Sequence, residues 1–275
     1  MRRLFVPAEK WLEARAVHAW TERGSPSGVL RGRVREPSEG ARITIEEEPH
    51  RHLSRVLRAR PGDKVTLFDG QGGEVDAEIL TIERDRTTLS LGERRQVAVP
   101  AGPRVVLLQS LARGERMDTI VQKTTELGVH EIVPIAAGRS VARLPAGEAA
   151  PRRARWQKIA QEAARQCGRA DIPAIADPRP LAEALAGTGR GPDQRRLALW
   201  EGSRGCPLRA ALAAGPVPAI VTLLVGPEGG FAEDEIAAAA QSGFEIVGLG
   251  PRILRVETAA IVAVALIQYA FGALD

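Results

Sequence analysis

The last fifth of the sequence contains two apolar segments that each end near a Gly-Pro pair and continue into a helical pattern. The first reads LLVGPEGGFAEDEI over 223–236, and the second has its strand end at 247–250 and continues as PRILRVETAA over 251–260. Two strand–loop–helix units in tandem predict neighbouring strands of a parallel α/β sheet, where ligands bind beyond the carboxyl ends of the strands. The two loops are therefore expected to form one composite pocket.

The residues of the first loop restrict the class of ligand. Gly226, Gly229 and Gly230 allow the backbone to approach a ligand closely. The loop lacks the lysine of a phosphate-binding P-loop and carries Glu228 instead, and the next helix opens with three acidic residues at 233–235. These carboxylates suit a helix amino terminus but repel phosphate. The loop thus favours a neutral or cationic ligand with an adenine- or ribose-like face; an ordinary tight turn before a charged helix start is the alternative.

Composition places the chain among globular proteins and gives a weak indication of an anionic partner. The 275 residues are 44% hydrophobic and 26% charged, with a formal net charge of +4 and a pI of about 9.6. Arginine supplies nearly all the basic residues, which suits RNA phosphates but also follows from GC-rich codon usage. No apolar run approaches the ~20 residues of a membrane span, and the amino terminus lacks an apolar core of signal-peptide length. We expect a cytoplasmic protein without a membrane contact.

The sequence contains no pattern of metal ligands. Cys167 and Cys206 have no C-x-x-C spacing, and only His50 and His52 stand close together among the four histidines. No metal site is expected. Aromatic residues make up 4% of the chain, so a broad stacking platform for single-stranded nucleic acid is not expected either.

The first third of the chain has the pattern of a small β-barrel. Alternating and β-branched segments over 43–91, separated by turn residues, predict a hairpin and further strands, with a short helix over 49–59. The Gly-, Ser-, Pro- and Arg-rich stretch 20–40 reads as a mobile connection, and 96–103 as a linker.

From residue 104 the pattern changes to alternating strands and helices. This alternation predicts a parallel sheet with helices on its faces. The last predicted helix, 258–271, is apolar nearly all round, so it is expected to be buried on more than one side, within a larger fold or, as we favour, between two copies of the chain. Ala232 stands where a helix usually has a Ser or Asp that caps its amino terminus. The missing cap lowers stability by about 1 kcal/mol, so we expect tertiary contacts to offset it.

Five blocks of the sequence resemble the bacterial 16S ribosomal RNA small-subunit methyltransferase E family. They occur in one order and span most of the chain, apart mainly from 11–40 and 187–215. The last two are highly specific together. The blocks are HRHLSRVLRARPGDKVTLFDG, IVQKTTELGVHEIVPI with the later GRSV, RWQKIAQEAARQCGR with ADIPAI, LLVGPEGGFAEDEI, and LGPRILRVETAA.

The resemblance implies both a fold and an activity. It implies an N-terminal PUA-like RNA-binding barrel over 1–95 and a C-terminal SPOUT α/β methyltransferase domain over 96–275, with a deep trefoil knot at about 197–271. It further implies a homodimer that uses S-adenosylmethionine to methylate the uracil N3 of one uridine in 16S rRNA of the small ribosomal subunit. A sulfonium donor agrees with the acidic loop, and a dimer agrees with the apolar terminal helix.

Mapped onto this sequence, the resemblance implies that three loops, at 199–201, 226–229 and 249–255, hold the donor through backbone groups and apolar walls. Val256 departs from the usual Thr, which puts a hydroxyl contact near the methyl group in doubt, and Ala232 departs from the usual Ser. The expected donor-binding residues are Leu199, Trp200, Glu201, Leu224, Gly226, Pro227, Glu228, Gly229, Leu249, Gly250, Ile253, Leu254, Arg255 and Thr258.

Two residues beside the third loop are candidates for catalysis. Uracil N3 carries a proton that must leave before its lone pair can attack, so a base is needed. Glu257 is the first candidate for that base, and its alternative role is to complement the helix dipole. Arg255 either stabilises charge on the uracil oxygens or pairs with Glu228 or Glu257. Because N3 lies on the pairing edge, the target base must be unpaired or extruded.

Eight arginines are candidates for RNA phosphates, and each is alternatively an ordinary solvated charge. Those after the first two strands of the α/β domain lie at the pocket edge and are preferred. The candidates are Arg2, Arg3, Arg55, Arg58, Arg113, Arg116, Arg139 and Arg169.

Three other functions compete with this interpretation. The nearest is a ribose 2′-O-methyltransferase of the same knotted class, and the second is a non-catalytic RNA-binding protein. A Rossmann-type dinucleotide enzyme is the third, but GQGGEV lacks the final glycine of G-x-G-x-x-G.

Overall fold

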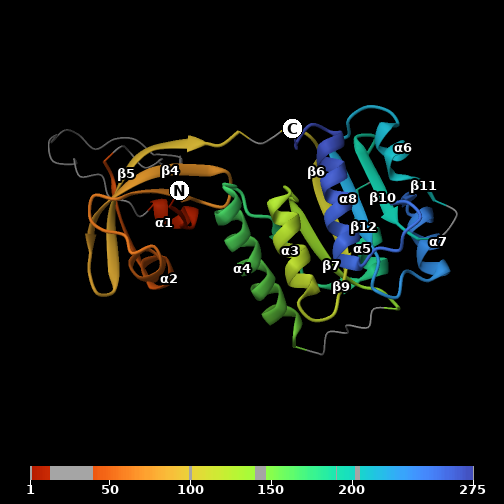
Figure 1. The fold of residues 1–275 in the computed structure, drawn as a ribbon, viewed down its shortest axis with the longest axis horizontal. Coiled ribbons are helices and arrows are strands. Elements are labelled where there is room, and N and C mark those ends of the chain that lie inside the picture. The colour runs from red at the N-terminus through yellow and green to blue at the C-terminus, as the bar shows by residue number, and fades with distance from the viewer. Residues whose placement is uncertain are drawn as a thin grey trace, which may run out of the picture. The chain divides into compact units, whose positions relative to one another are not determined.

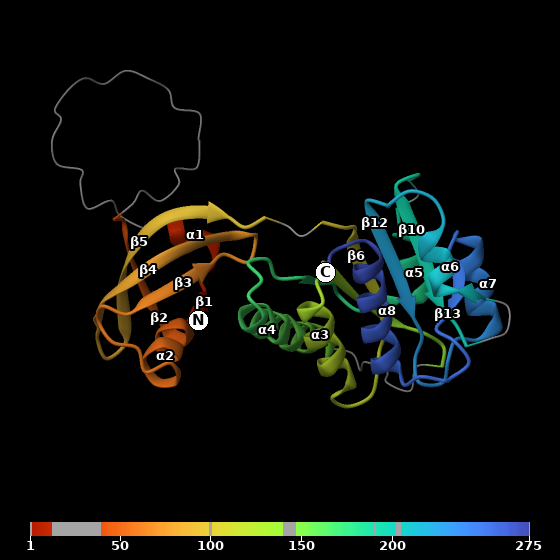
Figure 2. The ribbon, with the colours of Figure 1, turned by 45° about the horizontal axis from the view of Figure 1, so that its top comes forward.

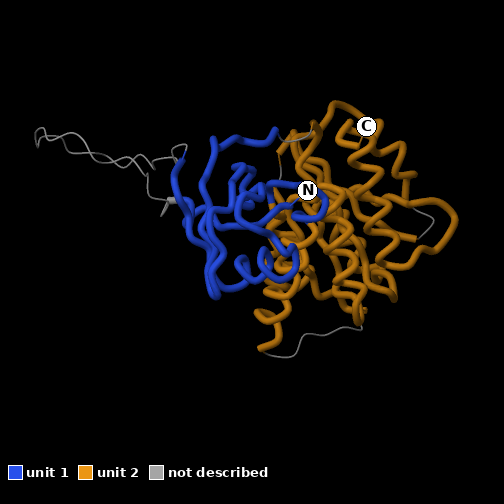
Figure 3. Tube along the Cα trace, turned by 60° about the vertical axis from the view of Figure 1, so that its left-hand side comes forward, with its two compact units in different colours: residues 1–99, 164–171 blue, residues 100–163, 172–275 orange. Residues whose placement is uncertain are grey.

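The computed structural model describes residues 2–12, 40–98, 101–139, 147–189, 191–201 and 205–274. Nearly all of the predicted connection at 20–40 lies outside these residues. The chain divides into two compact units, one of residues 1–99 and 164–171 and the other of 100–163 and 172–275 (Figure 3). The first unit thus includes the end of a helix that starts in the second.

The first unit contains a curled five-stranded sheet (Figure 1). Its order is β1-β3-β4-β5-β2, with β1 parallel to β3 and the other pairs antiparallel. Alternation of apolar and polar residues places one side chain in two in the core, as with Ile43 and Ile45 of β2. The strands are β1 (Arg3–Phe5), β2 (Arg42–Glu46), β3 (Lys64–Phe68), β4 (Gly73–Ile82) and β5 (Arg86–Gln96).

The helices of this unit are short. They are α1 (Ala8–Leu12), α2 (Glu47–Arg51) and the π-helical turn η1 (His52–Val56). The helix predicted over 49–59 therefore begins earlier and ends sooner. Its last turn is widened, and Arg58 follows with a φ of 47°, so the chain leaves the helix before Pro61-Gly62.

The second unit is built on an all-parallel sheet of order β11-β13-β10-β12-β6-β7-β8, with β9 also pairing with β7. Its central strands are buried on both faces, as their continuous apolar sequences predict. The strands are β6 (Arg104–Ser110), β7 (Glu131–Ala136), β8 (Ala174–Ile175), β9 (Arg179–Pro180), β10 (Gln194–Leu199), β11 (Cys206–Pro207), β12 (Ile220–Val225) and β13 (Glu245–Gly248).

Helices cover both faces of this sheet (Figures 1 and 2). Core residues of α3, α4, α6 and α8 pack on one face, and those of α5 and α7 pack on the other. The prediction of a parallel sheet between helices is thereby confirmed. The helices are α3 (Arg116–Glu126), α4 (Ala149–Cys167), α5 (Leu181–Ala186), α6 (Leu208–Ala213), α7 (Glu233–Gln241) and α8 (Val256–Ala270).

The order of the last three long strands brings three loops together. β10 lies between β12 and β13, so the chain crosses from one side of β10 to the other through α7. The loops after β10, β12 and β13 consequently emerge at one edge of the sheet. Ligands bind at such a reversal of strand order in α/β sheets.

Helix α8 buries one face and leaves a stripe of its other face exposed. Val256, Ala260, Val264 and Ile267 are buried in the core, whereas Leu266 is 42% and Tyr269 70% exposed. Within the single chain, the helix is therefore not buried all round.

Candidate functional site

The three loops enclose a cavity of about 350 Å³, which is within the range of ligand pockets. The first residue of α3 and the first turn of α8 complete its walls. Eleven of the expected donor-binding residues line it: Leu199, Trp200, Glu201, Gly226, Pro227, Glu228, Leu249, Gly250, Ile253, Leu254 and Arg255.

Three expected donor-binding residues do not line the cavity. Leu224 points to the opposite face of the sheet, where it packs with the residues of α5 and α7. Gly229 and Thr258 are exposed outside the cavity. Leu224 lies one position before Val225, which does line the cavity, because successive side chains of a strand face opposite sides.

Sequence reasoning missed several lining residues. Val225 and Val247 are apolar residues near the carboxyl ends of β12 and β13. The alternation of side chains along these two strands could have predicted that they face the cavity. Arg116 was expected to bind RNA instead. Five more lining residues are absent from the list of expected donor-binding residues, although Gly230 and Arg252 belong to segments that were expected to approach the ligand. The five are Gly230, Phe231, Arg252, Val256 and Ala259.

Two glycines of the loop after β12 lie in close contact with neighbouring side chains. A Cβ atom at Gly226 would lie 3.1 Å from the Phe231 ring. Gly230 has a φ of +67°, and a Cβ there would overlap the Glu201 carboxylate. Glycine thus lets this loop fold tightly against the first loop while leaving the cavity open.

Arg116 and Glu228 of the cavity wall lie close to Glu257, which is not itself one of the lining residues. Glu228 Oε1 accepts hydrogen bonds from the Arg113 backbone N–H at 2.9 Å and from Arg116 Nη1 at 2.8 Å. Arg116 Nε lies 3.9 Å from Glu257 Oε2. Burial alone would raise the pKa of Glu228, but the hydrogen bonds from the Arg113 and Glu228 backbones and from Arg116 outweigh it and lower the pKa. Glu228 is therefore an ionised link between two loops.

Glu235 in the first turn of α7 makes a second link. Its Oε2 accepts from the Ala232 N–H at 2.9 Å, and its Oε1 accepts from the Gly138 N–H at 2.7 Å. An alanine side chain cannot accept a hydrogen bond, so only the glutamate half of a capping box is present. The hydrogen bond from Gly138 to Glu235, which joins the loop after β7 to the start of α7, is a tertiary contact of the kind expected to offset the missing cap.

The third loop places cations at the rim of the cavity. Arg252 and Arg255 are exposed, and neither forms an ion pair with any residue that the structure describes. The expected alternative pairing of Arg255 with Glu228 or Glu257 is not observed, since Arg116 lies beside both carboxylates. Ile253 between them is 86% exposed.

The RNA candidates separate into two groups by their surroundings. Arg113 and Arg139 are exposed beside the cavity loops, and Arg55 and Arg58 are exposed in the first unit. Arg2 pairs with Asp63. The last of the eight, Arg169, is 14% exposed and pairs with Asp171 at 2.6 Å.

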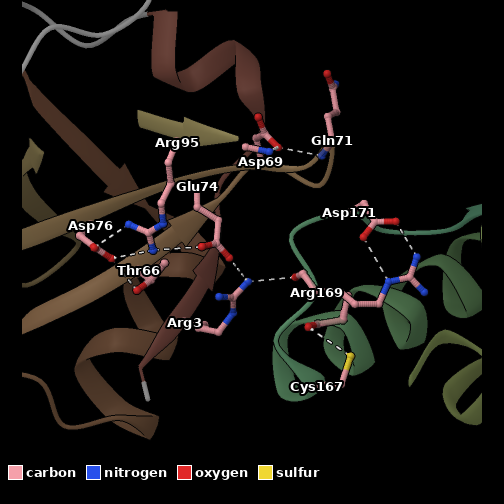
Figure 4. A network of polar contacts seen from close by, with 12 residues as sticks. Arg3, Thr66, Asp69, Gln71, Glu74, Asp76, Arg95, Cys167, Arg169 and Asp171 are labelled. Atoms are coloured by element: carbon pink, nitrogen blue, oxygen red, sulfur yellow. Dashed lines mark hydrogen bonds and ion pairs between the residues drawn. The ribbon is translucent and has the colours of Figure 1, made fainter. Parts of the chain in front are cut away.

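Arg3 is an internal residue of the first unit. Its side chain is 9% exposed, and Nη2 contacts Glu74 Oε1 at 2.5 Å and the Arg169 carbonyl at 3.0 Å (Figure 4). Its guanidinium also lies over the Phe68 ring, 5.2 Å from the centroid. Arg3 thus joins β1, β4 and the segment after α4, and it offers little surface to a phosphate.

No group of three or more His, Cys, Asp or Glu residues in the described ranges has an arrangement that suits a metal ion. None of the described helices combines the length and apolarity needed to cross a bilayer. The cavity instead combines glycine loops, apolar walls and the half-buried carboxylate of Glu228, which suits an organic ligand that carries positive charge.

Comparisons with known proteins agree with this geometry. A family profile described as an RNA methyltransferase domain matches residues 100–268, and one described as an RNA methyltransferase PUA domain matches 50–91. The ribosomal RNA small subunit methyltransferase E of Bacillus subtilis is 31% identical over 84% of this chain and 91% of its own length.

Two solved structures are similar along the whole chain. One is a ribosomal RNA small subunit methyltransferase E from Neisseria gonorrhoeae bound to S-adenosyl methionine, with a TM-score of 0.79 and 33% identity over 99% of this chain and 98% of the other. The second is a methyltransferase from Legionella pneumophila in complex with the same cofactor. It has a TM-score of 0.79 and 28% identity, and the match covers 98% of this chain and 97% of the other. The similarity therefore extends over the residues of both units.

Proposed function

The chain belongs to the ribosomal RNA small subunit methyltransferase E family, and we propose that it transfers a methyl group from S-adenosylmethionine to uracil N3 of one uridine in 16S rRNA. The observation that supports this most is the cavity at the ends of β10, β12 and β13, which matches a fold whose relative from N. gonorrhoeae holds this donor. An rRNA substrate places the activity in the cytoplasm.

The residues of the cavity fit a sulfonium donor. The Oε2 atoms of Glu228 and Glu257 are buried and lack a hydrogen-bond partner among the described residues. Unpaired buried carboxylate oxygens favour a ligand with positive charge or N–H donors. Leu249, Leu254 and Phe231 supply apolar wall for an adenine ring, and the glycine loops expose backbone groups for the ribose. When bound, the donor supplies an electrophilic methyl group.

The side chains near the cavity then have distinct roles. Glu257 accepts the N3 proton, so the N–H electron pair stays on nitrogen as the nucleophile. Arg255 at the rim stabilises negative charge on the uracil oxygens. The loops align the base with the methyl group, which supplies much of the rate by orientation.

RNA phosphates are bound by the exposed arginines. Arg113 and Arg139 lie beside the cavity loops and are assigned to phosphates near the target base, while Arg55 and Arg58 bind more distant RNA. Arg3 and Arg169 are assigned to internal contacts because their guanidinium groups are already engaged.

The dimer and the knot are further parts of the proposal. The exposed apolar stripe of α8, which includes Leu266 and Tyr269, is the surface that a second copy would cover. Leu266→Glu is expected to convert a dimer into a monomer in analytical ultracentrifugation. A trefoil knot over about 197–271 is retained as a prediction of the family, as are the domain limits 1–95 and 96–275.

The test is to identify the product. The protein is incubated with methyl-labelled donor and small subunits or 16S rRNA lacking the modification, and the RNA is digested to nucleosides. Labelled 3-methyluridine is expected, whereas label on a ribose oxygen or on guanine would reject the substrate assignment. Glu257→Gln should slow turnover and retain donor binding, and unchanged turnover would remove Glu257 as the base.

A further inference from the structure

The guanidinium of Arg116, at the cavity, lies within ion-pair distance of two carboxylates. Arg116 at the start of α3 contacts Glu228 at 2.8 Å and lies 3.9 Å from Glu257. Both glutamate side chains are 19% exposed. They come from separate elements, the loop after β12 and the first turn of α8, so the sheet edge brings two negative charges to one cation.

The three groups carry one unbalanced negative charge. Glu228 Oε1 accepts two hydrogen bonds, but Glu228 Oε2 and Glu257 Oε2 are buried without a hydrogen-bond partner among the described residues. The Glu257 side chain is 19% exposed, so its carboxylate can take up a proton at the oxygen that is not buried, provided that the carboxylate stays ionised. Two carboxylates at one buried site normally do not both ionise unless a cation lies close.

Within the described ranges, no cation other than Arg116 forms an ion pair with Glu257. The remaining charged residues of the cavity wall are Glu201, which adds negative charge, and the exposed Arg252 and Arg255. Strand β12, which packs on α8, has no titratable side chain. The other charges of α3 and α6, the two helices packed on α8, are Asp118 paired with Arg155, Lys123 paired with Glu126, and the exposed Arg209.

We propose that Arg116 is a positioning residue for methyl transfer, which keeps Glu257 ionised by sharing its charge between Glu257 and Glu228. This inference rests on the proposed function, in which Glu257 takes the N3 proton. The N3–H bond breaks, its electron pair remains on nitrogen, and the proton forms an O–H bond at the accessible oxygen of the Glu257 carboxylate. A Glu257 that is already protonated cannot accept it. In this proposal Arg116 supports the proton transfer to Glu257, whereas the sequence had suggested that it binds an RNA phosphate.

The test compares the pH dependence of kcat in Arg116→Gln and wild type. The variant is expected to lose about tenfold or more in kcat at neutral pH, and the acidic limb of the profile is expected to move to higher pH by about one unit or more. The Kd for S-adenosylmethionine and the KM for RNA should stay within about threefold. Arg116→Lys retains a positive charge and should keep the limb near its wild-type position.

Two further variants separate this role from folding and from RNA binding. Glu228→Gln added to Arg116→Gln removes the repelling carboxylate, so the acidic limb should return toward the wild-type pH. Arg113→Gln changes an exposed arginine of the loop between β6 and α3, and the backbone N–H of residue 113 still binds Glu228. This variant should raise the KM for RNA without moving the acidic limb.

An unshifted limb in Arg116→Gln, a raised KM with unchanged kcat, or no return of the limb in the double variant would each overturn the inference. These results are distinct from a failure of the proposed function, which would appear as absence of 3-methyluridine from wild type or as full activity of Glu257→Gln.

Discussion

Replacing Glu235 by alanine should destabilise the second unit by about 2 kcal/mol relative to a matched change at Glu233. Glu235 accepts two charge-assisted hydrogen bonds, from Ala232 at 2.9 Å and Gly138 at 2.7 Å. Each is worth about 1.5 kcal/mol for a half-buried carboxylate, and the ordered side chain loses about 1 kcal/mol of entropy. Glu233 lies in the same helical turn but is exposed, so both changes share the helix-dipole and propensity effects.

The assay is calorimetric unfolding of the full chain with both single variants. A difference of about 2 kcal/mol corresponds to roughly 4–8 °C in the transition of a unit of this size. Glu235→Ala should also raise the KM for RNA, because the released loop carries Arg139. If the two variants unfold within about 1 °C of each other, the two hydrogen bonds do not stabilise the start of α7 and the reasoning is refuted.

Three further results are expected. Arg3→Met should destabilise the first unit by about 2–3 kcal/mol in urea unfolding, since it leaves the buried Glu74 with a single, more exposed arginine partner; a change below about 0.5 kcal/mol would contradict this. The lowered pKa of Glu228 means that its contribution to stability is present above its unfolded pKa and is lost as pH falls through its folded pKa, so Glu228→Gln should flatten the loss of stability below about pH 5, and an equally steep loss would argue against it. The hydrogen bond to Glu245, burial and the nearby charge raise the pKa of the Cys206 thiol, so Glu245→Gln should speed its alkylation at pH 8, and an unchanged rate would remove that cause.

The part of the pocket formed by the loops after β12 and β13 was predictable because its signals are local, whereas the loop at 199–201 was expected only from the family resemblance. Each of the two marked strands ends beside a Gly-Pro pair, and parallel strands deliver their ends to one edge. Leu224 was expected at the donor site from its motif, but it faces α5 and α7 because successive residues of β12 point to opposite sides of the sheet. Val225, the next residue, lines the cavity instead.

The ion pairs were not predictable in the same way. Arg116 and Glu228 are separated by 112 residues, and no local pattern indicates that their side chains meet. Arg3 reads as an exposed terminal arginine, yet the pairing of β1 with β3 turns it toward Glu74. Such contacts depend on strand order, which the periodicity of a single sequence does not fix.

The most direct measurement of the central claim is a calorimetric titration of the protein with S-adenosylmethionine. We expect one donor per chain in wild type, no saturable heat with ATP, and loss of donor binding in Ala259→Phe, which fills the cavity wall, but not in Ala237→Phe on the exposed side of α7. Saturable binding of ATP with no binding of S-adenosylmethionine, or equal donor binding by both phenylalanine variants, would contradict the account.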